Sequence, residues 1–307
     1  MKRICVFFSE PNIYDYPFDD PLYLDSYKEL ASVLEAHGAE LSIVRGVDSY
    51  LEKGKFKNSW KFINGDLVET GLVVADVIFD RGTRGNLVTD GSVPLLNIPE
   101  VNEICTDKWK SYQAFKQFSP LTKLALSDAE LSAAFDEITT KKIVVKPLEG
   151  EGGRGVFIGT REVFKIETPQ PEYPLLVQEW LDSSIGIPGV VDGMHDFRIT
   201  MMDGNFIFAF VRTPPPGGLK ANFSEGGELT VIEKENIPKE FWDVLSSVES
   251  YMSKFPSRMY SIDMALTPSG PRIIELNSRV GLLESTRHSV FSDFKQKLAR
   301  KLISLAQ

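Results

Sequence analysis

The sequence predicts an α/β protein, with a doubly wound α/β domain at its N-terminus and α+β architecture over the C-terminal two thirds. Two observations carry this prediction. In the first hundred residues, apolar runs of strand length alternate with apolar residues at helical spacing. In the remaining residues, strand-like runs come in hairpin pairs separated by helix patterns. At roughly 100–200 residues per domain, a chain of 307 residues has room for two or three domains.

Composition and charge exclude several functional classes. The chain has 34 Lys and Arg against 43 Asp and Glu, and its net charge of −9 argues against a broad nucleic-acid surface. No stretch approaches the ~18 uninterrupted apolar residues of a membrane span, so we expect no membrane association. The two cysteines and three scattered histidines predict neither a disulfide scaffold nor a zinc cluster. The N-terminal apolar run is too short for a signal peptide, so the expected compartment is the cytoplasm.

The N-terminal domain is expected to cover residues 1–104. The loop after its first strand, Ser9–Asn12, lacks the glycines that let a backbone approach a pyrophosphate, so we expect no dinucleotide site there. Strands are predicted at residues 4–8, 40–44 and 73–80, and a helix is marked by Tyr23, Tyr27, Leu30 and Leu34.

Two further domains are expected after a break at residues 98–106. Thr106 is predicted to cap a helix that opens the central domain, residues 105–182. A capping box from Ser127 to Glu130 begins the next helix of that domain. The C-terminal domain, residues 183–307, is expected to contain hairpins turning at Asp203-Gly204 and at Ser269, a helix from Pro238 and a terminal helix from Phe291 to Leu302.

The segment Gly150-Glu151-Gly152-Gly153-Arg154-Gly155 matches G-x-G-x-x-G, a pattern that is weak by itself. Because it leads into a strand-like run rather than a helix, the Rossmann and Walker interpretations fail, and the protein-kinase motifs that should follow are missing. What remains is a flexible hairpin able to fold backbone N–H groups over a polyphosphate, or a loose surface loop. Lys146, in an otherwise apolar strand just before the hairpin, favours the phosphate interpretation, because an unpaired buried lysine is costly.

The predicted hairpin of residues 260–277 offers a metal site. Strand alternation and a turn centred on Ser269 place Asp263 directly opposite Glu275, with Asn277 on the same face. Two carboxylates across a sheet repel each other unless a cation lies between them. An all-oxygen set with places left for phosphate and water suits Mg²⁺, and the alternative is a solvated polar face.

Several arginines are candidates for binding phosphate or carboxylate groups. Arg198 and Arg212 lie on the Asp203-Gly204 hairpin, and each taken singly could equally be a surface ion pair. Arg81 and Arg84 follow a predicted parallel strand, at the edge where open α/β sheets bind ligands, and could capture a substrate carboxylate or form a solvated turn. His195 is interpreted as structural, because it and its neighbour Asp196 would face opposite sides of a strand.

These residues, taken in order, resemble the ATP-grasp superfamily, most closely its glutathione synthetase and ribosomal-protein glutamate ligase branch. The resemblance covers roughly residues 105–285, implies a fold of two ATP-grasp subdomains after a preceding α/β domain, and implies ATP and two Mg²⁺ ions, for which Mn²⁺ could substitute. The motifs are Lys108, Lys146-Pro147, the glycine hairpin, Gln178-Glu179-Trp180-Leu181, Asp196-Phe197-Arg198, Arg212, Asn222 with Gly226-Gly227, Asp263 and Glu275-Leu276-Asn277.

The resemblance implies a role for each motif. Lys108 and Lys146 would contact ATP phosphates, and Glu179 to Leu181 would form the hinge strand that reads adenine. Arg212 and Asn222 would steady the phosphoryl group and the developing oxyanion. The remaining nucleotide contacts would come from Gly152, Gly153, Gly155, Gln178 and Arg198, the metal ligands would be Asp263, Glu275 and Asn277, and Arg81, Arg84 and Arg279 would bind substrate.

We therefore expect an ATP-dependent carboxylate–amine ligase that forms an amide through an acyl phosphate and releases ADP and phosphate. Its substrates would be small carboxylates and amines such as amino acids or peptides, and a homodimer is one of the assemblies left open. Arg279 stands where this branch usually has a Pro-Gly pair, so the acceptor could carry an unusual acidic group. The alternatives are a non-catalytic, synapsin-like ATP-binding regulator and an ATP-grasp kinase that phosphorylates a hydroxyl group. The net charge of −9 gives little support to the kinase, because the substrates of such kinases need a dense basic pocket.

Overall fold

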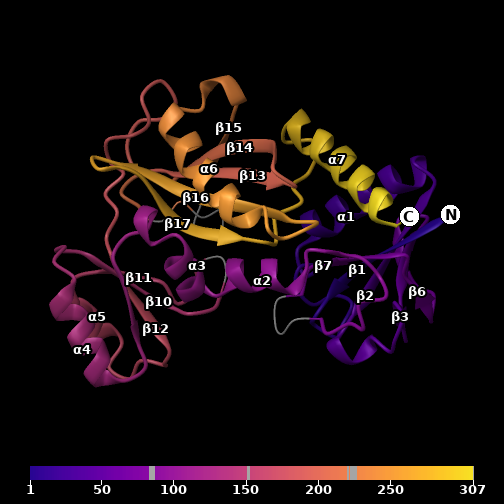
Figure 1. Ribbon diagram of the computed structural model, residues 1–307, viewed down its shortest axis with the longest axis horizontal. Coiled ribbons are helices and arrows are strands. Elements are labelled where there is room, and N and C mark those ends of the chain that lie inside the picture. The colour runs from indigo at the N-terminus through magenta and orange to yellow at the C-terminus, as the bar shows by residue number, and fades with distance from the viewer. Residues whose placement is uncertain (83–86, 151–152, 220, 222–226, 307) are drawn as a thin grey trace. The chain divides into compact units, whose positions relative to one another are not determined.

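The computed structural model describes residues 1–82, 87–150, 153–219, 221 and 227–306 (Figure 1). The chain divides into two compact units. The predicted division into residues 1–104, 105–182 and 183–307 stays a prediction. Unit 1 contains Met1–Asn102, Phe255–Met259 and Arg279–Gln307, and unit 2 contains Glu103–Lys254 and Tyr260–Ser278.

Unit 1 is built on a six-stranded sheet whose central strands are parallel. The predicted strands at residues 4–8 and 40–44 are confirmed, whereas the single strand predicted at residues 73–80 is divided into β6 (Val73–Val74) and β7 (Val77–Asp80), which belong to different sheets. Residues 4–8 take the centre because an unbroken apolar run can be buried on both faces of a sheet. Across the sheet the strands are β5 (Asp66–Glu69), β4 (Trp60–Ile63), β2 (Ala39–Arg45), β1 (Lys2–Phe8), β7 (Val77–Asp80) and β8 (Leu95–Leu96), while β3 (Lys55–Phe56) pairs with β6 (Val73–Val74) and a short 3-10 helix covers Val47–Ser49.

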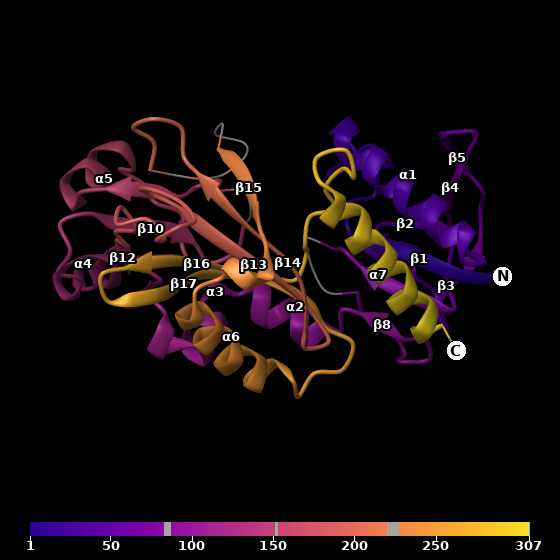
Figure 2. The same ribbon diagram turned by 90° about the horizontal axis from the view of Figure 1, so that it is seen from above.

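The helices of unit 1 come from both ends of the chain. Helix α1 (Pro21–Ala36) buries Tyr27, Leu30 and Leu34, as its spacing predicts. Helix α7 (Ser289–Leu305) lies beside α1 in both views (Figures 1 and 2). The buried ammonium of Lys295 joins the two helices through an ion pair with Glu29. The apolar face of this terminal helix packs in unit 1.

The first sheet of unit 2 carries a helical layer on one face. Side chains that alternate along its strands pack against helices α4 (Asp128–Glu137) and α5 (Arg161–Glu167), where they contact Phe135 and Phe164. One bond of the predicted capping box is present, because Ser127 accepts the Glu130 N–H, whereas the Glu130 carboxylate accepts the N–H of Leu126, the residue before the cap. Across this antiparallel sheet the strands are β11 (Phe157–Gly159), β10 (Ile143–Pro147), β12 (Leu175–Glu179) and β9 (Thr122–Ala125).

The second sheet of unit 2 packs on helix α6 (Lys239–Met252). The rings of Phe197 and Phe241 lie 4.7 Å apart between them, and the helix begins at Lys239, one residue after the predicted start at Pro238. The predicted hairpins at Asp203-Gly204 and before residue 277 are both present. Across the sheet the strands are β15 (Glu228–Ile232), β14 (Asn205–Thr213), β13 (Asp196–Met202), β16 (Met259–Thr267) and β17 (Gly270–Asn277), and a 3-10 helix covers Lys234–Asn236.

One predicted cap is wrong. Thr106 ends helix α2 (Pro99–Thr106), which was not predicted, and the next helix, α3 (Lys108–Ala114), is capped by Asp107. The Asp107 carboxylate accepts the N–H groups of Trp109 and Lys110, which an aspartate does at least as well as a threonine. A 3-10 helix over Lys116–Phe118 follows α3. None of the helices described here is long and apolar enough to cross a membrane.

Candidate ATP site in unit 2

In the four-stranded sheet of unit 2, side chains on one face pack in a hydrophobic core, and side chains on the other face line a cavity. Ile143 and Val145 of β10 face α4 and α5, so Val144 and Lys146 must face the opposite side. Val144 is paired with Gln178 on β12, which therefore lies on the same face. This face forms one wall of a cavity of about 170 Å³.

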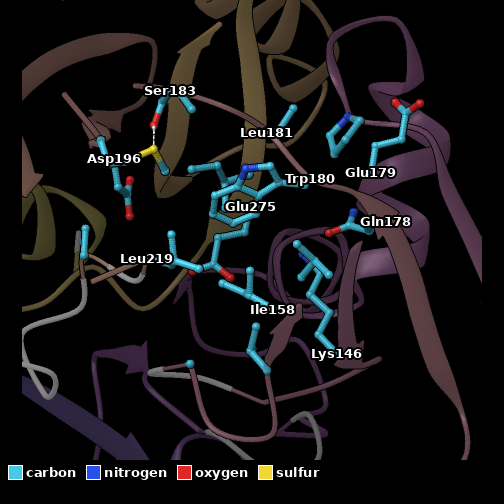
Figure 3. Close-up of a pocket in the computed structure, with 18 of the residues that line it drawn as sticks. Lys146, Ile158, Gln178, Glu179, Trp180, Leu181, Ser183, Asp196, Leu219 and Glu275 are labelled. Carbon is cyan, nitrogen blue, oxygen red and sulfur yellow. Dashed lines mark hydrogen bonds between the residues drawn. The ribbon is translucent and has the colours of Figure 1, made fainter. Parts of the chain in front are cut away.

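The cavity lies wholly within unit 2 and combines an apolar slot with cationic and acidic groups. Figure 3 shows Gln178 to Leu181 on one side of it, and Asp196 and Leu219 on the other. Its polar lining includes Lys108, Lys146, Arg154, Gln178, Glu179, Asp196 and Glu275, and its apolar lining includes Val144, Ile158, Trp180, Leu181, Met194, Leu219 and Ile274.

Lys146 is a strongly perturbed cation of the cavity. It is 6% exposed, and no hydrogen bond to its ammonium is found within the described parts of the chain. Burial lowers the pKa of Lys146 to about 8, with a further lowering by Lys108 and an opposing effect of Glu275. A buried ammonium of this kind gains most from an anionic ligand.

Lys108 connects helix α3 to the glycine hairpin. Its ammonium donates to the carbonyl of Gly150 at 2.8 Å. The predicted strand–hairpin–strand arrangement is confirmed, because Val145 pairs with Phe157 in an antiparallel ladder. Gly155 has φ +70°, and a Cβ atom there would lie 3.4 Å from Pro147 Cδ, so glycine is favoured at this position. Gly153 lines the cavity, whereas Gly152 lies outside the described residues.

The predicted hinge residues Gln178 to Leu181 all line the cavity. The Gln178 amide donates to Thr122 Oγ1 at 2.7 Å, which fixes its orientation in the wall. The Glu179 carboxylate accepts the Leu121 N–H at 3.1 Å and so ties the end of β12 to β9. These contacts join the end of β12 to the start of β9 where β12 borders the apolar slot.

The predicted pairing of Asp263 with Glu275 is confirmed by the register of β16 and β17. The turn, however, is centred half a residue before Ser269, the predicted centre, because Thr267 pairs with Gly270. A β-bulge at Ile274 restores the predicted register beyond it. The bulge also turns both Ile274 and Glu275 toward the cavity, which simple alternation does not allow.

A buried ion cluster lies beside Glu275. Arg198 Nε donates to Asp263 at 2.5 Å and Arg212 donates to the same carboxylate at 2.9 Å. Arg212 also pairs with Asp196, which lines the cavity. Burial alone would raise the pKa of Asp263, but the two guanidiniums outweigh it and hold that pKa below its usual range. Burial raises the pKa of Asp196 to about 7, against the opposing effect of Arg212.

The proposed metal ligands lie together. The Asn277 amide group is 3.3 Å from a Glu275 oxygen and 3.5 Å from an Asp263 oxygen. Two carboxylates and one amide oxygen fit the hard-ligand chemistry of Mg²⁺. No cluster of three or more His, Cys, Asp or Glu able to hold a metal occurs in the part of the chain that the structure describes, so phosphate oxygens or water would have to complete the coordination.

His195 is structural, as predicted, although it also borders the cavity. Its Nδ1 lies 3.0 Å from the Gly193 carbonyl, and its Nε2 accepts the Leu266 N–H at 3.0 Å, so Nδ1 carries the proton. Burial lowers the pKa of His195. Asp196 is a lining residue to which the sequence analysis gave no role, although its position within Asp196-Phe197-Arg198 was the available signal.

The substrate arginines predicted from the sequence lie in unit 1. Arg81 follows β7, is buried, and donates to the Tyr27 hydroxyl at 3.0 Å. Arg279 follows β17 and donates to the carbonyl of Gly82. The structure thus brings these two segments together within unit 1. Arg84 and the predicted catalytic residue Asn222 lie outside the described residues.

Comparison with solved structures shows that the fold is that of ATP-grasp enzymes. An ATP-grasp RimK domain protein from Sphaerobacter thermophilus superposes with a TM-score of 0.64 at 15% identity, covering 97% of this chain and 98% of the other. Residues 107–263 match the family described as prokaryotic glutathione synthetase, ATP-grasp domain, and the chain belongs to that family.

Two curated relatives extend the comparison beyond this domain. A probable alpha-L-glutamate ligase from Legionella pneumophila is 22% identical over 273 residues, which is 85% of each chain. A glutathione synthetase from Prochlorococcus marinus is 27% identical over 244 residues, covering 78% of this chain and 72% of the relative. The predictions of the ATP-grasp fold and of an ATP-dependent carboxylate–amine ligase are confirmed, and ATP is the nucleotide of this family.

Proposed function

We propose that the unit 2 cavity binds ATP, with the base in the apolar slot beside Gln178 to Leu181 and the phosphates at Lys108, Lys146 and the glycine hairpin. The observation that carries this proposal is that one cavity collects the two lysines, the hinge residues and Glu275. Lysines act as point charges on phosphates, and backbone N–H groups of a glycine hairpin can donate to them. Gly152, Gly155 and Arg198 complete the proposed set as predicted from the sequence.

Asp263, Glu275 and Asn277 are the residues proposed to hold Mg²⁺. A metal ion held there would neutralise negative charge on the ATP phosphates, and two Mg²⁺ ions are proposed, with Mn²⁺ as a substitute. Because Arg198 and Arg212 already contact Asp263, metal binding must share that carboxylate with them or replace one of them. Arg212 and Asn222 are proposed to steady the transferring phosphoryl group.

The proposed reaction has two steps. A carboxylate oxygen of the substrate attacks the γ-phosphorus of ATP, the bond to the bridging oxygen breaks, and ADP leaves. The amine then attacks the acyl carbon, phosphate leaves with the bonding electrons, and the amine loses a proton as the amide forms. No nucleophilic residue is required, since positioning and charge neutralisation carry both steps.

The proposed substrates are an amino acid or peptide carboxylate and an amine of the same class. The curated relatives are named as a glutamate ligase and a glutathione synthetase, so L-glutamate is the first substrate to test. Arg81, Arg84 and Arg279 are the proposed carboxylate-binding residues. The cytoplasm and a homodimer stay predictions without a structural test.

The test is to trap the acyl phosphate. Hydroxylamine supplied in place of the amine, with ATP, Mg²⁺ and candidate carboxylates, should give a hydroxamate in step with ADP and phosphate. Arg212→Ala should lower this turnover by about 10²–10³-fold while changing ATP affinity far less, because a contact made mainly in the transition state acts on kcat. A stable phosphate ester would identify a kinase, AMP would identify an adenylating enzyme, and binding without turnover would identify a regulator.

A further inference from the structure

Two neighbouring strands of the cavity wall carry a hydrogen-bonded pair of polar side chains, Thr122 of β9 and Gln178 of β12. The two residues are direct partners in the antiparallel ladder, so their side chains lie on the same face of the sheet. Thr122 is 1% exposed and Gln178 is 7% exposed, and the Gln178 Nε2 atom donates to Thr122 Oγ1 at 2.7 Å. A buried bond of this kind can fix the orientation of an amide group.

The direction of this hydrogen bond is set by a third group, the carbonyl of Pro120. Thr122 Oγ1 lies 2.9 Å from that carbonyl oxygen, which can accept a hydrogen bond but cannot donate one. A hydroxyl has a single proton, and Thr122 donates it to Pro120. The Thr122 oxygen must then accept from Gln178, so the side of the amide that faces Thr122 is its NH₂ group.

The oxygen of the same amide is left for the cavity. Figure 3 shows the Gln178 oxygen turned into the cavity that Trp180 and Leu181 also border. Within the described ranges of the chain, no donor to this Oε1 atom is found. The amide oxygen is an acceptor at the edge of an apolar slot, so a ligand in the slot gains most if it brings a donor to this point.

This arrangement distinguishes two kinds of purine. Adenine carries an amino group at position 6, which donates hydrogen bonds, whereas guanine and hypoxanthine carry an oxygen there, which accepts them. A 6-oxopurine could pair with Gln178 only after the amide had flipped. The flip would place Oε1 against Thr122 Oγ1, whose proton is committed to Pro120, and would break a buried hydrogen bond.

We propose that Thr122 is a positioning residue that makes the unit 2 cavity prefer 6-aminopurine over 6-oxopurine nucleotides, because it holds the Gln178 oxygen toward the base. The inference rests on the proposed binding of ATP in this cavity. Gln178 makes the contact with the base, and Thr122 acts through Gln178. The base preference therefore depends on a buried hydroxyl of the neighbouring strand as well as on the residue in the cavity wall.

The experiment measures the dissociation constants of Mg-ATP and Mg-ITP (inosine triphosphate) by calorimetry on the full chain. ITP is the probe because its base differs from adenine by the oxygen at position 6 and the accompanying ring proton. Thr122→Val keeps the branched shape but removes the acceptor, so the amide can turn freely. ITP should then bind about tenfold more tightly, because one buried hydrogen bond no longer opposes the flip. ATP should bind about twofold more weakly, because half of the amide groups face the wrong way.

Three further variants separate positioning from a general structural role. Thr122→Ser restores the hydroxyl and should restore the ratio of the two dissociation constants. Thr200→Val is the matched control and should leave the ratio unchanged, because Thr200 is a fully buried strand threonine whose hydroxyl has no partner in the described structure. In a Gln178→Glu background, Thr122→Val should no longer alter the ratio, because a carboxylate presents an acceptor to the base in either orientation.

The outcomes separate this inference from the proposed function. If Lys146→Met weakens ATP binding but Thr122→Val leaves the ratio of the ATP and ITP constants unchanged, the ATP site stands and the role of Thr122 is overturned. An equal loss of affinity for both nucleotides in Thr122→Val, or an equal change of the ratio in Thr200→Val, also overturns it. Failure of the unaltered protein to bind ATP would refute the proposed function itself, and the inference with it.

Discussion

ATP binding should take up a proton at Lys146 when the pH is above about 8. In the free protein burial lowers the pKa of Lys146 to about 8. The phosphates of bound ATP would restore the pKa toward the ordinary lysine value of about 10.4. Below pH 8 the ammonium is charged before and after binding, so pH has little effect. Above pH 8 binding must first protonate a neutral amine, and affinity falls as the pH rises.

The size of the effect follows from these two pKa values. Between pH 7 and pH 9 the charged fraction of free Lys146 falls by about tenfold, so the dissociation constant for ATP should rise by about tenfold, or about 1.4 kcal/mol. Asp196, whose pKa is raised to about 7 by burial, is largely ionised in the upper part of this range. Proton uptake at pH 9 should approach one per ATP bound.

The assay is calorimetry with a non-hydrolysable ATP analogue at constant free Mg²⁺, in two buffers with different ionisation enthalpies. Lys146→Arg is the matched control, because a guanidinium stays charged throughout this range and should abolish both the proton uptake and the tenfold change. Lys146→Met should bind weakly at every pH. An unchanged affinity between pH 7 and pH 9, or an equal fall in Lys146→Arg, would refute the reasoning.

Three further predictions concern metal binding and stability. Glu275→Ala should remove most of the Mg²⁺ dependence of ATP affinity measured by calorimetry, whereas the control Glu179→Ala should keep it. A Mg²⁺ dependence that Glu275→Ala leaves unaltered would exclude Glu275 as a metal ligand. Burial lowers the pKa of His195 in the folded protein. As the pH falls below the ordinary histidine pKa of about 6.5, the unfolded chain takes up a proton that the folded chain does not, so the free energy of unfolding should fall. Denaturant unfolding at pH 7.5 and 5.5 should show a smaller loss of stability in His195→Asn than in the unaltered protein, and an equal loss in both would contradict this. Glu29→Gln leaves the buried Lys295 without its counter-ion and should lower the free energy of unfolding by about 1–3 kcal/mol, with Glu35→Gln, on an exposed site of the same helix, as the neutral control.

Local patterns predicted most elements because their causes lie within a few residues. The spacing of Tyr27, Leu30 and Leu34 predicts the buried face of α1, and the Ser127 capping box predicts the start of α4. The error at Thr106 was also local. The residues before Thr106 are a continuous mixture of polar and apolar side chains, which does not indicate that a short helix ends at Thr106. The adjacent Asp107 is the stronger cap.

The candidate site was predictable in its residue types but not in its detailed contacts. Asp263 and Glu275 were paired correctly, although the assumed turn was incorrect and the bulge at Ile274 compensated for it. A bulge is set by the packing of both sheet faces, which one strand's sequence does not specify. The contacts of Arg198 and Arg212 with Asp263 depend on strands β13 and β14 lying next to β16, and such long-range order is not encoded in local spacing.

The position of α7 has a consequence for the order in which the protein folds during synthesis. Lys295 and Glu29 are separated by 266 positions, so α1 gains its partner helix only after the residues between them have been synthesised. Both segments of unit 2, Glu103–Lys254 and Tyr260–Ser278, lie between α1 and α7 in the sequence, so unit 2 can fold first on the nascent chain. Its folding shortens the effective loop that must close to bring α7 to α1. The strands of unit 1 that precede unit 2 in the sequence are therefore among the last to become protected, and a chain that lacks α7 should lose the structure of unit 1 first.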